Sequence, residues 1–216
     1  MKLAAVLLVC LLGCVGQSPY QRTTNGVTRL RTLDGGYQQV LQLAAIYKSP
    51  TWRSAHAEKD ASNRGLTGDA RTQRIAQAQA DAAGPLEFEL LVTTWDRREN
   101  DLDRGKKSVW KVRMLDDAGA EIEPIELVRD KRPMLTLRSE FPAMGDFATA
   151  YIVRFKRPTT ALAQLRLRMS SERGGVEVSW PGIEGSPEPP PPAKPEPAPG
   201  PPNPEPAPAG SVERSP

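Results

Sequence analysis

A period of two in the hydrophobic residues is the strongest constraint on the fold of this chain. From Leu86 to Trp180 apolar residues alternate with polar ones in short segments, a pattern typical of strands with one face in a core. Seven such segments are separated by short turns, over residues 86–92, 110–114, 122–129, 134–138, 150–156, 162–169 and 176–180. This spacing predicts a mainly β protein, an antiparallel immunoglobulin-like β-sandwich.

The core of this sandwich is predicted from the large side chains that share one face of each strand. They are Phe88, Leu90, Trp110, Val112, Leu127, Leu137, Tyr151, Val153, Phe155, Leu165, Leu167, Val178 and Trp180. Each buried side chain of this size contributes about 1.5–3 kcal/mol, so we expect a stable body without disulfide bonds. Pro124 predicts an edge strand or a bulge within residues 122–129, because proline cannot donate to a sheet ladder.

A two-helix insertion over residues 50–83 is predicted ahead of the strands. Ser49 followed by Pro50 is typical of an N-cap and first helical position, and opens a helix over 51–63. Thr67 or Asp69 caps a second helix over 70–83, which we expect on the domain surface.

Residues 36–48 fit two interpretations. Their apolar residues match a helical period, but they also suit an apolar strand. The strand is favoured because Gly35-Gly36 interrupts the helical pattern.

The amino terminus has the features of an export signal. Met1-Lys2 is followed by a stretch, Leu3 to Leu12, without a polar side chain, which is too short to span a bilayer. Residues 1–13 are therefore predicted to be a signal peptide.

The end of this signal, Leu11-Leu12-Gly13-Cys14, resembles the lipobox of bacterial lipoproteins, with an aliphatic residue three before the cysteine and a small residue just before it. The resemblance implies that Cys14 becomes the first mature residue, with palmitate-type chains on its sulfur and amino group. Each buried methylene adds about 0.8 kcal/mol, so several chains anchor the protein to a membrane. The alternative is a secreted protein with a free thiol.

The lipobox resemblance also implies a location in the cell. Val15-Gly16 lacks the acidic residue that retains enterobacterial lipoproteins in the inner membrane, so we expect the outer membrane of the cell envelope. Residues 14–35 are expected to form a lipidated tether and residues 36–183 the folded domain.

The body resembles a group of uncharacterised lipoproteins of myxobacteria and their relatives. The resembling segments are Tyr47-Lys48-Ser49-Pro50, Asn100-Asp101-Leu102-Asp103, Ser108-Val109-Trp110, Phe141-Pro142 and Tyr151-Ile152-Val153-Arg154-Phe155. This resemblance implies one envelope domain and no particular activity.

The carboxyl end is a low-complexity tail. Fourteen of the 22 prolines lie between Pro187 and Pro216, so residues 184–216 are predicted to be disordered and extended at about 3.1 Å per residue. Such a tail is a spacer or a docking peptide.

Composition excludes several functions. Without the signal and tail the chain has 26 basic and 22 acidic residues, a net charge of +4 that is too mild for nucleic-acid binding. Cys10 leaves with the signal, and the single histidine, His56, is expected on a solvated helix face, so we assign no catalytic residue. No glycine-rich phosphate loop is present, and no cofactor is expected.

The loop over residues 96–103 is the most chemically suggestive segment. Asn100, Asp101 and Asp103 offer oxygen ligands for Ca²⁺, but their spacing is not that of an EF-hand, so we assign no metal site. The favoured interpretation is a salt-bridged turn. A hydrolase of envelope polymers using carboxylates of this loop is the alternative.

Basic residues also mark the predicted strands. Arg154, Lys156, Arg166 and Arg168 lie at outward positions, where they either form a basic face for envelope polymers or pair across strands with Glu87, Glu89, Glu126 and Glu177. Pairing is favoured. The sequence therefore predicts a non-catalytic binding or structural module of the envelope, with an envelope protein or cell-wall polymer as partner.

Overall fold

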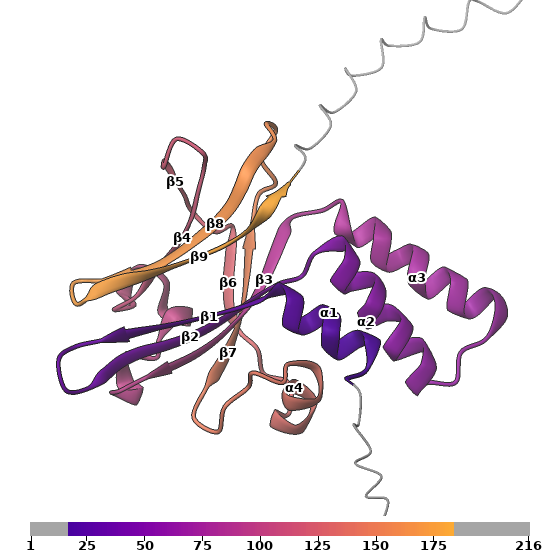
Figure 1. Ribbon diagram of the computed structural model, residues 1–216, viewed down its shortest axis with the longest axis horizontal. Helices are drawn as coiled ribbons and strands as arrows, with labels where there is room; N and C mark the ends of the chain where they lie inside the picture. Colours follow the sequence, from indigo (N-terminus) through magenta and orange to yellow (C-terminus); the bar gives the residue numbers. More distant parts are fainter. Residues whose placement is uncertain (1–16, 184–216) are drawn as a thin grey trace, which may run out of the picture. The chain divides into compact units, whose positions relative to one another are not determined.

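The structure is a computed structural model that describes residues 17–183. The signal peptide, Cys14 and the proline-rich tail predicted above lie outside the described residues. Within residues 17–183, nine strands form two antiparallel sheets (Figure 1). The first sheet has the order β1(Thr28–Asp34), β2(Gln39–Tyr47), β3(Leu86–Thr94), β7(Thr149–Phe155), β6(Glu126–Arg129), and the second has the order β5(Glu121–Ile122), β4(Lys111–Leu115), β8(Leu162–Ser171), β9(Gly174–Ile183).

The helical elements come from four regions of the described chain. They are α1(Pro19–Val27), α2(Pro50–Asn63), α3(Gly68–Ala82), α4(Met134–Glu140) and the 3₁₀ turns η1(Arg97–Glu99) and η2(Leu102–Lys107). A mainly β architecture with two antiparallel sheets is thus confirmed, whereas the helices are not confined to the amino-terminal part.

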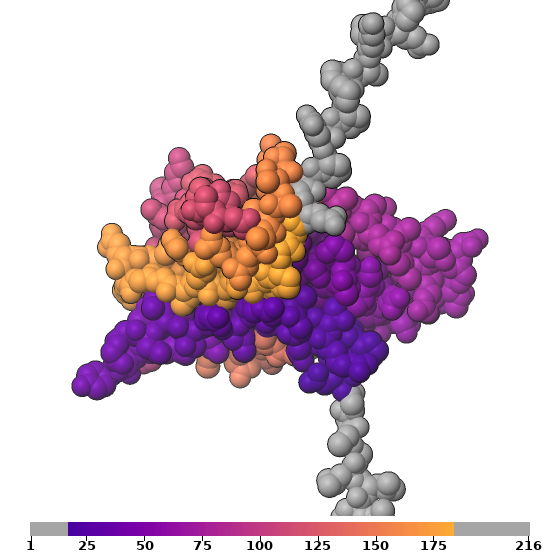
Figure 2. All heavy atoms as spheres, turned by 45° about the horizontal axis from the view of Figure 1, so that its top comes forward, coloured from indigo at the N-terminus to yellow at the C-terminus, as the bar shows by residue number. Residues whose placement is uncertain are grey.

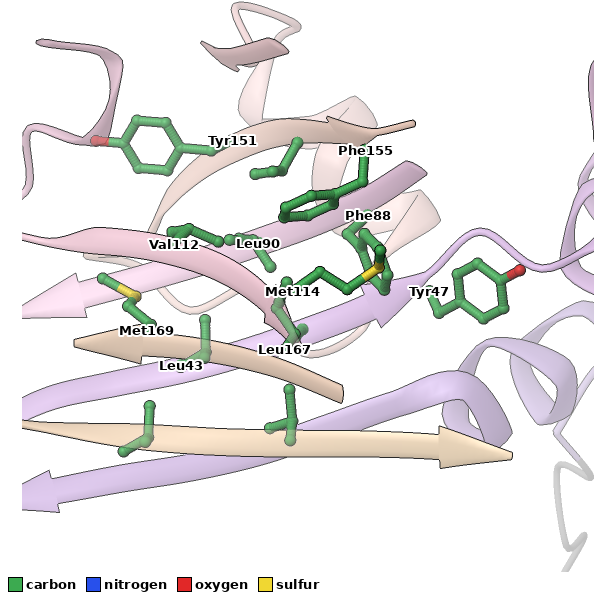
Figure 3. Packing of buried hydrophobic residues seen from close by; sticks show 14 of the residues in the cluster. Leu43, Tyr47, Phe88, Leu90, Val112, Met114, Tyr151, Phe155, Leu167 and Met169 are labelled. Carbon is green, nitrogen blue, oxygen red and sulfur yellow. The ribbon is translucent and has the colours of Figure 1, made fainter. Parts of the chain in front are cut away.

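The inner core fills the space between the two sheets (Figure 3). Phe88 lies at its centre, with ring centroids 5.3 Å from Tyr47 and from Trp180 and 5.8 Å from Phe155. Most of the predicted core residues are buried here, while Leu127 packs against this core half-buried. Alternation along the strands therefore identified the inner face of both sheets.

The helical insertion agrees with the sequence prediction. The Ser49 hydroxyl accepts a hydrogen bond from the Trp52 amide at 3.1 Å, and Pro50 occupies the first turn of α2. Thr67 precedes α3 but makes no side-chain cap, and α3 buries only Ala78 and Ala82. Residues 39–47 form β2, so the strand interpretation of that segment is confirmed.

The tether predicted for residues 14–35 is wrong from residue 19 onward. Ser18 and Gln21 form a reciprocal capping box that starts α1, and β1 pairs with β2 along its whole length. Gly36, with φ of 77°, allows the tight turn between these strands. β1 also lies alongside β9 (Figure 2). Between these strands Arg29 Nε donates to the Ser179 carbonyl at 2.9 Å.

The strand predicted over residues 134–138 is instead helix α4. Leu137 is buried, while Leu135 remains 81 % exposed, so the two leucines do not share one face as they would in a strand. Backbone bonds from the Leu137 amide to Pro133 and from the Phe141 amide to Leu137 close the helical turns. Leu137 therefore packs outside the first sheet and not in the predicted core.

The segment predicted as one strand over 122–129 is divided between the sheets. Glu121–Ile122 pairs with β4, and Glu126–Arg129 pairs with β7. Pro124 lies in the crossing, and both short strands are sheet edges, as expected for a residue without an amide donor.

A second apolar cluster, the outer cluster, covers the other face of the first sheet. It joins side chains of β2, β3 and β7 to those of α1, α2 and the α4 region: Tyr20, Ala44, Ile46, Trp52, Leu91, Leu137, Phe141, Met144, Ala148 and Ala150. The central strands β2, β3 and β7 are therefore covered on both faces.

Candidate functional site

The loop over residues 96–103 is a structural tie. The Asn100 side-chain Nδ2 donates to the Val92 carbonyl at 2.7 Å, and the Tyr151 hydroxyl donates to Asn100 Oδ1 at 2.9 Å. Asn100 therefore joins the loop to β3 and β7, and its side chain is buried.

The two aspartates of the same loop have different surroundings. Buried Asp101 accepts bonds from the Ser108 hydroxyl at 2.8 Å and the Val109 amide at 3.1 Å. Half-exposed Asp103 faces Arg129 at 3.7 Å. Within residues 17–183 no group of three or more His, Cys, Asp or Glu side chains is arranged to hold a metal ion.

The carboxylates on which a hydrolase would depend are also engaged separately. Asp96 Oδ1 accepts from the Arg98 amide at 2.9 Å and caps η1, whereas Asp101 holds the start of β4. Asp96, Asp101 and Asp103 line none of the five cavities described for residues 17–183. The loop geometry thus favours the salt-bridged turn.

Arg154, Arg166 and Arg168 pair with glutamates and do not form one face, whereas Lys156 follows β7 and makes no ion pair within 4.0 Å among the described residues. Arg154 belongs to β7 in the first sheet, where its Nε lies 2.8 Å from Glu87 Oε2 and its Nη1 contacts Glu126. Arg168 belongs to β8 in the second sheet and lies 3.3 Å from Glu177. Cross-strand pairing, the favoured interpretation, is confirmed for Arg154, Arg166 and Arg168 but not for Lys156.

Glu89 does not occupy the outward, solvated position expected from the alternation. It is fully buried under the α4 region, where Lys48 Nζ lies 2.9 Å and Arg132 Nη2 3.8 Å from Glu89 Oε2. Asp130 accepts two bonds from the Arg132 guanidinium, at 2.8 and 2.6 Å. We call Lys48, Glu87, Glu89, Asp130 and Arg132 the buried charge cluster.

Burial and charge act in opposite directions on the carboxyls of this cluster. Burial raises the pKa of Glu89 to about 7, and Lys48 offsets only part of that rise. Burial also disfavours the charged form of Glu87, but Lys48 and Arg154 outweigh it and lower the pKa to about 2. Glu89 is therefore the group of this cluster that titrates near neutrality.

His56 is not the solvated surface residue that the sequence predicted. Its ring stacks on Trp52 with centroids 4.9 Å apart, and its Nε2 lies 3.4 Å from Glu140 Oε1. Glu140 in turn accepts from Arg132 at 2.6 Å. His56 thus extends the buried charge cluster across α2 and α4, and its contacts give it a role in holding these layers.

A groove lies where the ends of β2 and β9 meet the starts of β1 and α2. Its volume is about 450 Å³, and its lining includes Val27, Arg29, Tyr47, Pro50, Arg157 and Trp180. The Tyr47 and Trp180 rings lie 6.2 Å apart, and the Trp180 indole donates to the Val27 carbonyl at 2.6 Å. We call this cavity the arginine groove.

The two arginines of this groove differ from all other half-buried arginines of residues 17–183. Arg53, Arg74, Arg113, Arg132, Arg154, Arg166 and Arg168 each lie within 4.0 Å of a carboxylate. Arg29 donates only to the carbonyls of Gly26, Thr28 and Ser179. Arg157 donates to the carbonyls of Ala82 and Gly84.

This groove was not predicted from the sequence, because Arg29 was assigned to the tether. Trp180 was assigned to the core, which is correct for its ring, but its position at the end of the last strand also places it beside Tyr47. The Tyr47–Pro50 segment, where a strand runs directly into a helix cap, was the available signal.

Comparisons with known proteins give little further guidance. No protein-family model matches the chain, and a search of curated proteins finds no match. The chain is similar to a crystal structure of a DUF4426 family protein from Pseudomonas aeruginosa, with 10 % identity over 72 % of this chain and 97 % of that one. The TM-score is 0.30, too low to support an argument. Among residues 17–183, no helix is long and apolar enough to cross a membrane.

Proposed function

We propose that this chain is a lipid-anchored protein of the cell envelope whose immunoglobulin-like β-sandwich is a non-catalytic binding module. The lipobox resemblance at Leu11-Leu12-Gly13-Cys14 supports the anchor, and the absence of an acidic residue at Val15-Gly16 supports the outer membrane. The partner is an envelope component that reaches the arginine groove.

The strand order supports the immunoglobulin-like assignment. Without β1, the first sheet has the order β2-β3-β7-β6 and the second the order β5-β4-β8-β9. Lettered along the chain, these are A-B-E-D and C′-C-F-G, the arrangement of immunoglobulin sandwiches. In this assignment β1 is an added edge strand, and α2 and α3 occupy the connection between strands A and B.

The arginine groove is the observation on which the binding function rests. It combines a concave apolar surface with a few polar groups, as small-molecule sites do. Its two arginines have no carboxylate partner among the described residues, whereas the acidic loop uses the Asp101 carboxylate to hold the fold. The groove is thus better suited to binding than the loop is to catalysis.

The anchor is tested by replacing the lipidated cysteine. We expect Cys14→Ser to move the protein from the membrane fraction to the soluble periplasm, or to leave an uncleaved precursor. Fractionation with labelled palmitate measures both. Unchanged membrane residence, together with an unlabelled wild type, would contradict the lipid anchor.

The binding function is tested by filling the groove. A Cβ at Gly26, a groove residue, would meet no atom within 4 Å, so Gly26→Phe adds a ring there without a clash at Cβ. Gly145→Phe is the matched control, because that glycine is exposed, equally unobstructed and outside the groove. Envelope material that co-purifies with the wild type and with Gly145→Phe should be lost from Gly26→Phe. Equal recovery from all three would exclude the groove as the binding site.

A further inference from the structure

We infer that the arginine groove binds a single molecule of an anionic amphiphile, with one carboxylate or phosphate group on an apolar body. This inference depends on the proposed binding function, since it names the class of ligand for the same site. It follows from the apolar wall, the unneutralised charge and the position of helix α2.

The apolar wall accounts for the body of the ligand. Tyr47 and Trp180 are almost completely buried, and Val27 and Pro50 extend the wall. The volume of about 450 Å³ falls within the usual range for small-molecule sites, roughly 300–1,000 Å³. An extended lipid surface would contact only the rim of such a cavity, so a single molecule is the better fit.

The charge of the groove accounts for the anionic group. Arg29 and Arg157 contribute two positive charges, and no acidic residue of the described chain lines this cavity. A half-buried cation without a nearby anion is unfavourable, and carbonyl bonds compensate it only in part. Arg29 also keeps its Nη2 without an acceptor among the described residues. An anionic ligand would supply the missing partner.

In the other four cavities described for residues 17–183, each arginine shares the cavity with a carboxylate that offsets its charge. The one beside Arg53 and Arg154 also contains Glu87 and Glu126, and the one beside Arg113 contains Glu123. Arg173 faces Glu99, and Arg129 shares its cavity with Asp146. The arginine groove is thus the one cavity of the five, all within residues 17–183, that has arginine but no carboxylate.

The start of helix α2 adds to the positive electrostatic potential of the arginine groove. Ser49 and Pro50 line the groove, so the positive end of a 14-residue helix lies at its wall. This contribution is secondary to the two guanidinium groups, because it falls off within the first turn.

Three matched probes measure how much the apolar chain and the carboxylate each contribute to binding. Octanoate has an apolar chain and a carboxylate, octanol has the chain alone, and acetate has the carboxylate alone. Isothermal titration of the chain from Cys14 to Pro216, produced without lipid, should give octanoate the highest affinity. We expect octanol to bind about tenfold more weakly, the effect of one charge-assisted hydrogen bond, and acetate more weakly still.

Charge variants test the two arginines. Arg29→Gln and Arg157→Gln should each weaken octanoate binding about tenfold and leave octanol binding within about twofold, because only the carboxylate loses its partner. Arg29→Lys should retain part of the octanoate affinity, since it keeps the charge. Thermal melting of each variant measures whether the fold is kept, and Gly145→Phe should bind as the wild type does.

The results that overturn the inference differ from those that overturn the binding function. Equal affinity for octanol and octanoate, or octanoate affinity unchanged in both glutamine variants, would exclude the anionic amphiphile while leaving the groove as a binding site. Binding to phosphatidylglycerol vesicles that Gly26→Phe blocks, without octanoate binding, would also exclude it. Octanoate binding unchanged by Gly26→Phe would instead exclude the groove itself.

Discussion

The two faces of the first sheet are covered by different kinds of side chain. The inner core, between the sheets, consists of apolar side chains such as Phe88 and Val153, contributed by strands. The outer cluster, on the other face, packs strands against helices and lies beside the buried charge cluster, with Lys48, Glu89 and Arg132. Both faces exclude water, but only the inner one does so without carboxylate, lysine or arginine side chains.

This difference shows that a charged residue in an alternating strand is not sufficient evidence of a solvated face. Glu87 and Glu89 share the outer face of β3 and occupy neighbouring outward positions, yet Glu87 lies near the edge of the covering layer and Glu89 beneath it. The neighbouring outward residue, Leu91, is buried in the outer cluster. The presence of Leu91 on that face is the signal that the face is covered.

The largest expected effect comes from the inner core. Phe88→Ala should lower the free energy of unfolding by about 3–5 kcal/mol, because it removes a ring packed against Tyr47, Phe155 and Trp180 and leaves a cavity. Urea denaturation measures the change. Phe147→Ala is the matched control: that ring is 66 % exposed, and its removal should cost less than about 1 kcal/mol. Equal losses would contradict the position of the core.

The inner core could be predicted from the sequence because strand alternation is a local property. Trp110, Tyr151 and Leu165 each lie where the period of two places them. The outer cluster could not, because Tyr20 and Trp52 come from polar segments, and the segment before Phe141 was assigned to a strand. Their burial depends on long-range contacts, such as the Tyr20 hydroxyl donating to the Glu140 carbonyl at 2.9 Å.

The second prediction concerns Glu89, in the buried charge cluster on the outer face of the first sheet. The pKa of Glu89 is about 7 in the folded state, above its ordinary value of 4.5, so the folded state binds the proton more tightly than the unfolded state does. Stability should therefore be highest below about pH 4.5 as far as Glu89 is concerned, and should decrease as the pH rises to about 7. The loss is on the order of 3 kcal/mol.

Glu89→Gln tests this sign, because glutamine cannot ionise. Urea denaturation at pH 5 and pH 8 should show a decrease in the wild type that the variant lacks. Glu126→Gln is the matched control, since Glu126 is half-exposed and pairs with Arg154 at the surface, and it should keep the wild-type pH dependence. A variant as pH-dependent as the wild type would exclude Glu89 as the titrating group.

Of the two candidate sites, the acidic loop could be predicted from the sequence and the arginine groove could not. The acidic loop was found because its residues are adjacent in sequence, but the burial of Asn100 and Asp101 depends on β3, β4 and β7. The arginine groove was missed because Arg29, Tyr47, Arg157 and Trp180 are far apart in the chain. The Tyr47–Pro50 junction marks one wall of the groove, but nothing in the order of the chain indicates that Arg29, Arg157 and Trp180 meet it there.

The smallest expected effect is the difference between Asp101 and Asp103, which the sequence alone does not distinguish. Asp101→Ala should cost about 1–3 kcal/mol, because it leaves the buried Ser108 hydroxyl and the Val109 amide without their acceptor. Asp103→Ala should cost less than about 1 kcal/mol, since it removes only a half-exposed pair with Arg129. Because both carboxylates are engaged by protein donors, Ca²⁺ and a chelator should give the same melting curve. A calcium-dependent rise in melting temperature that disappears in Asp101→Ala would instead show that the loop holds an ion.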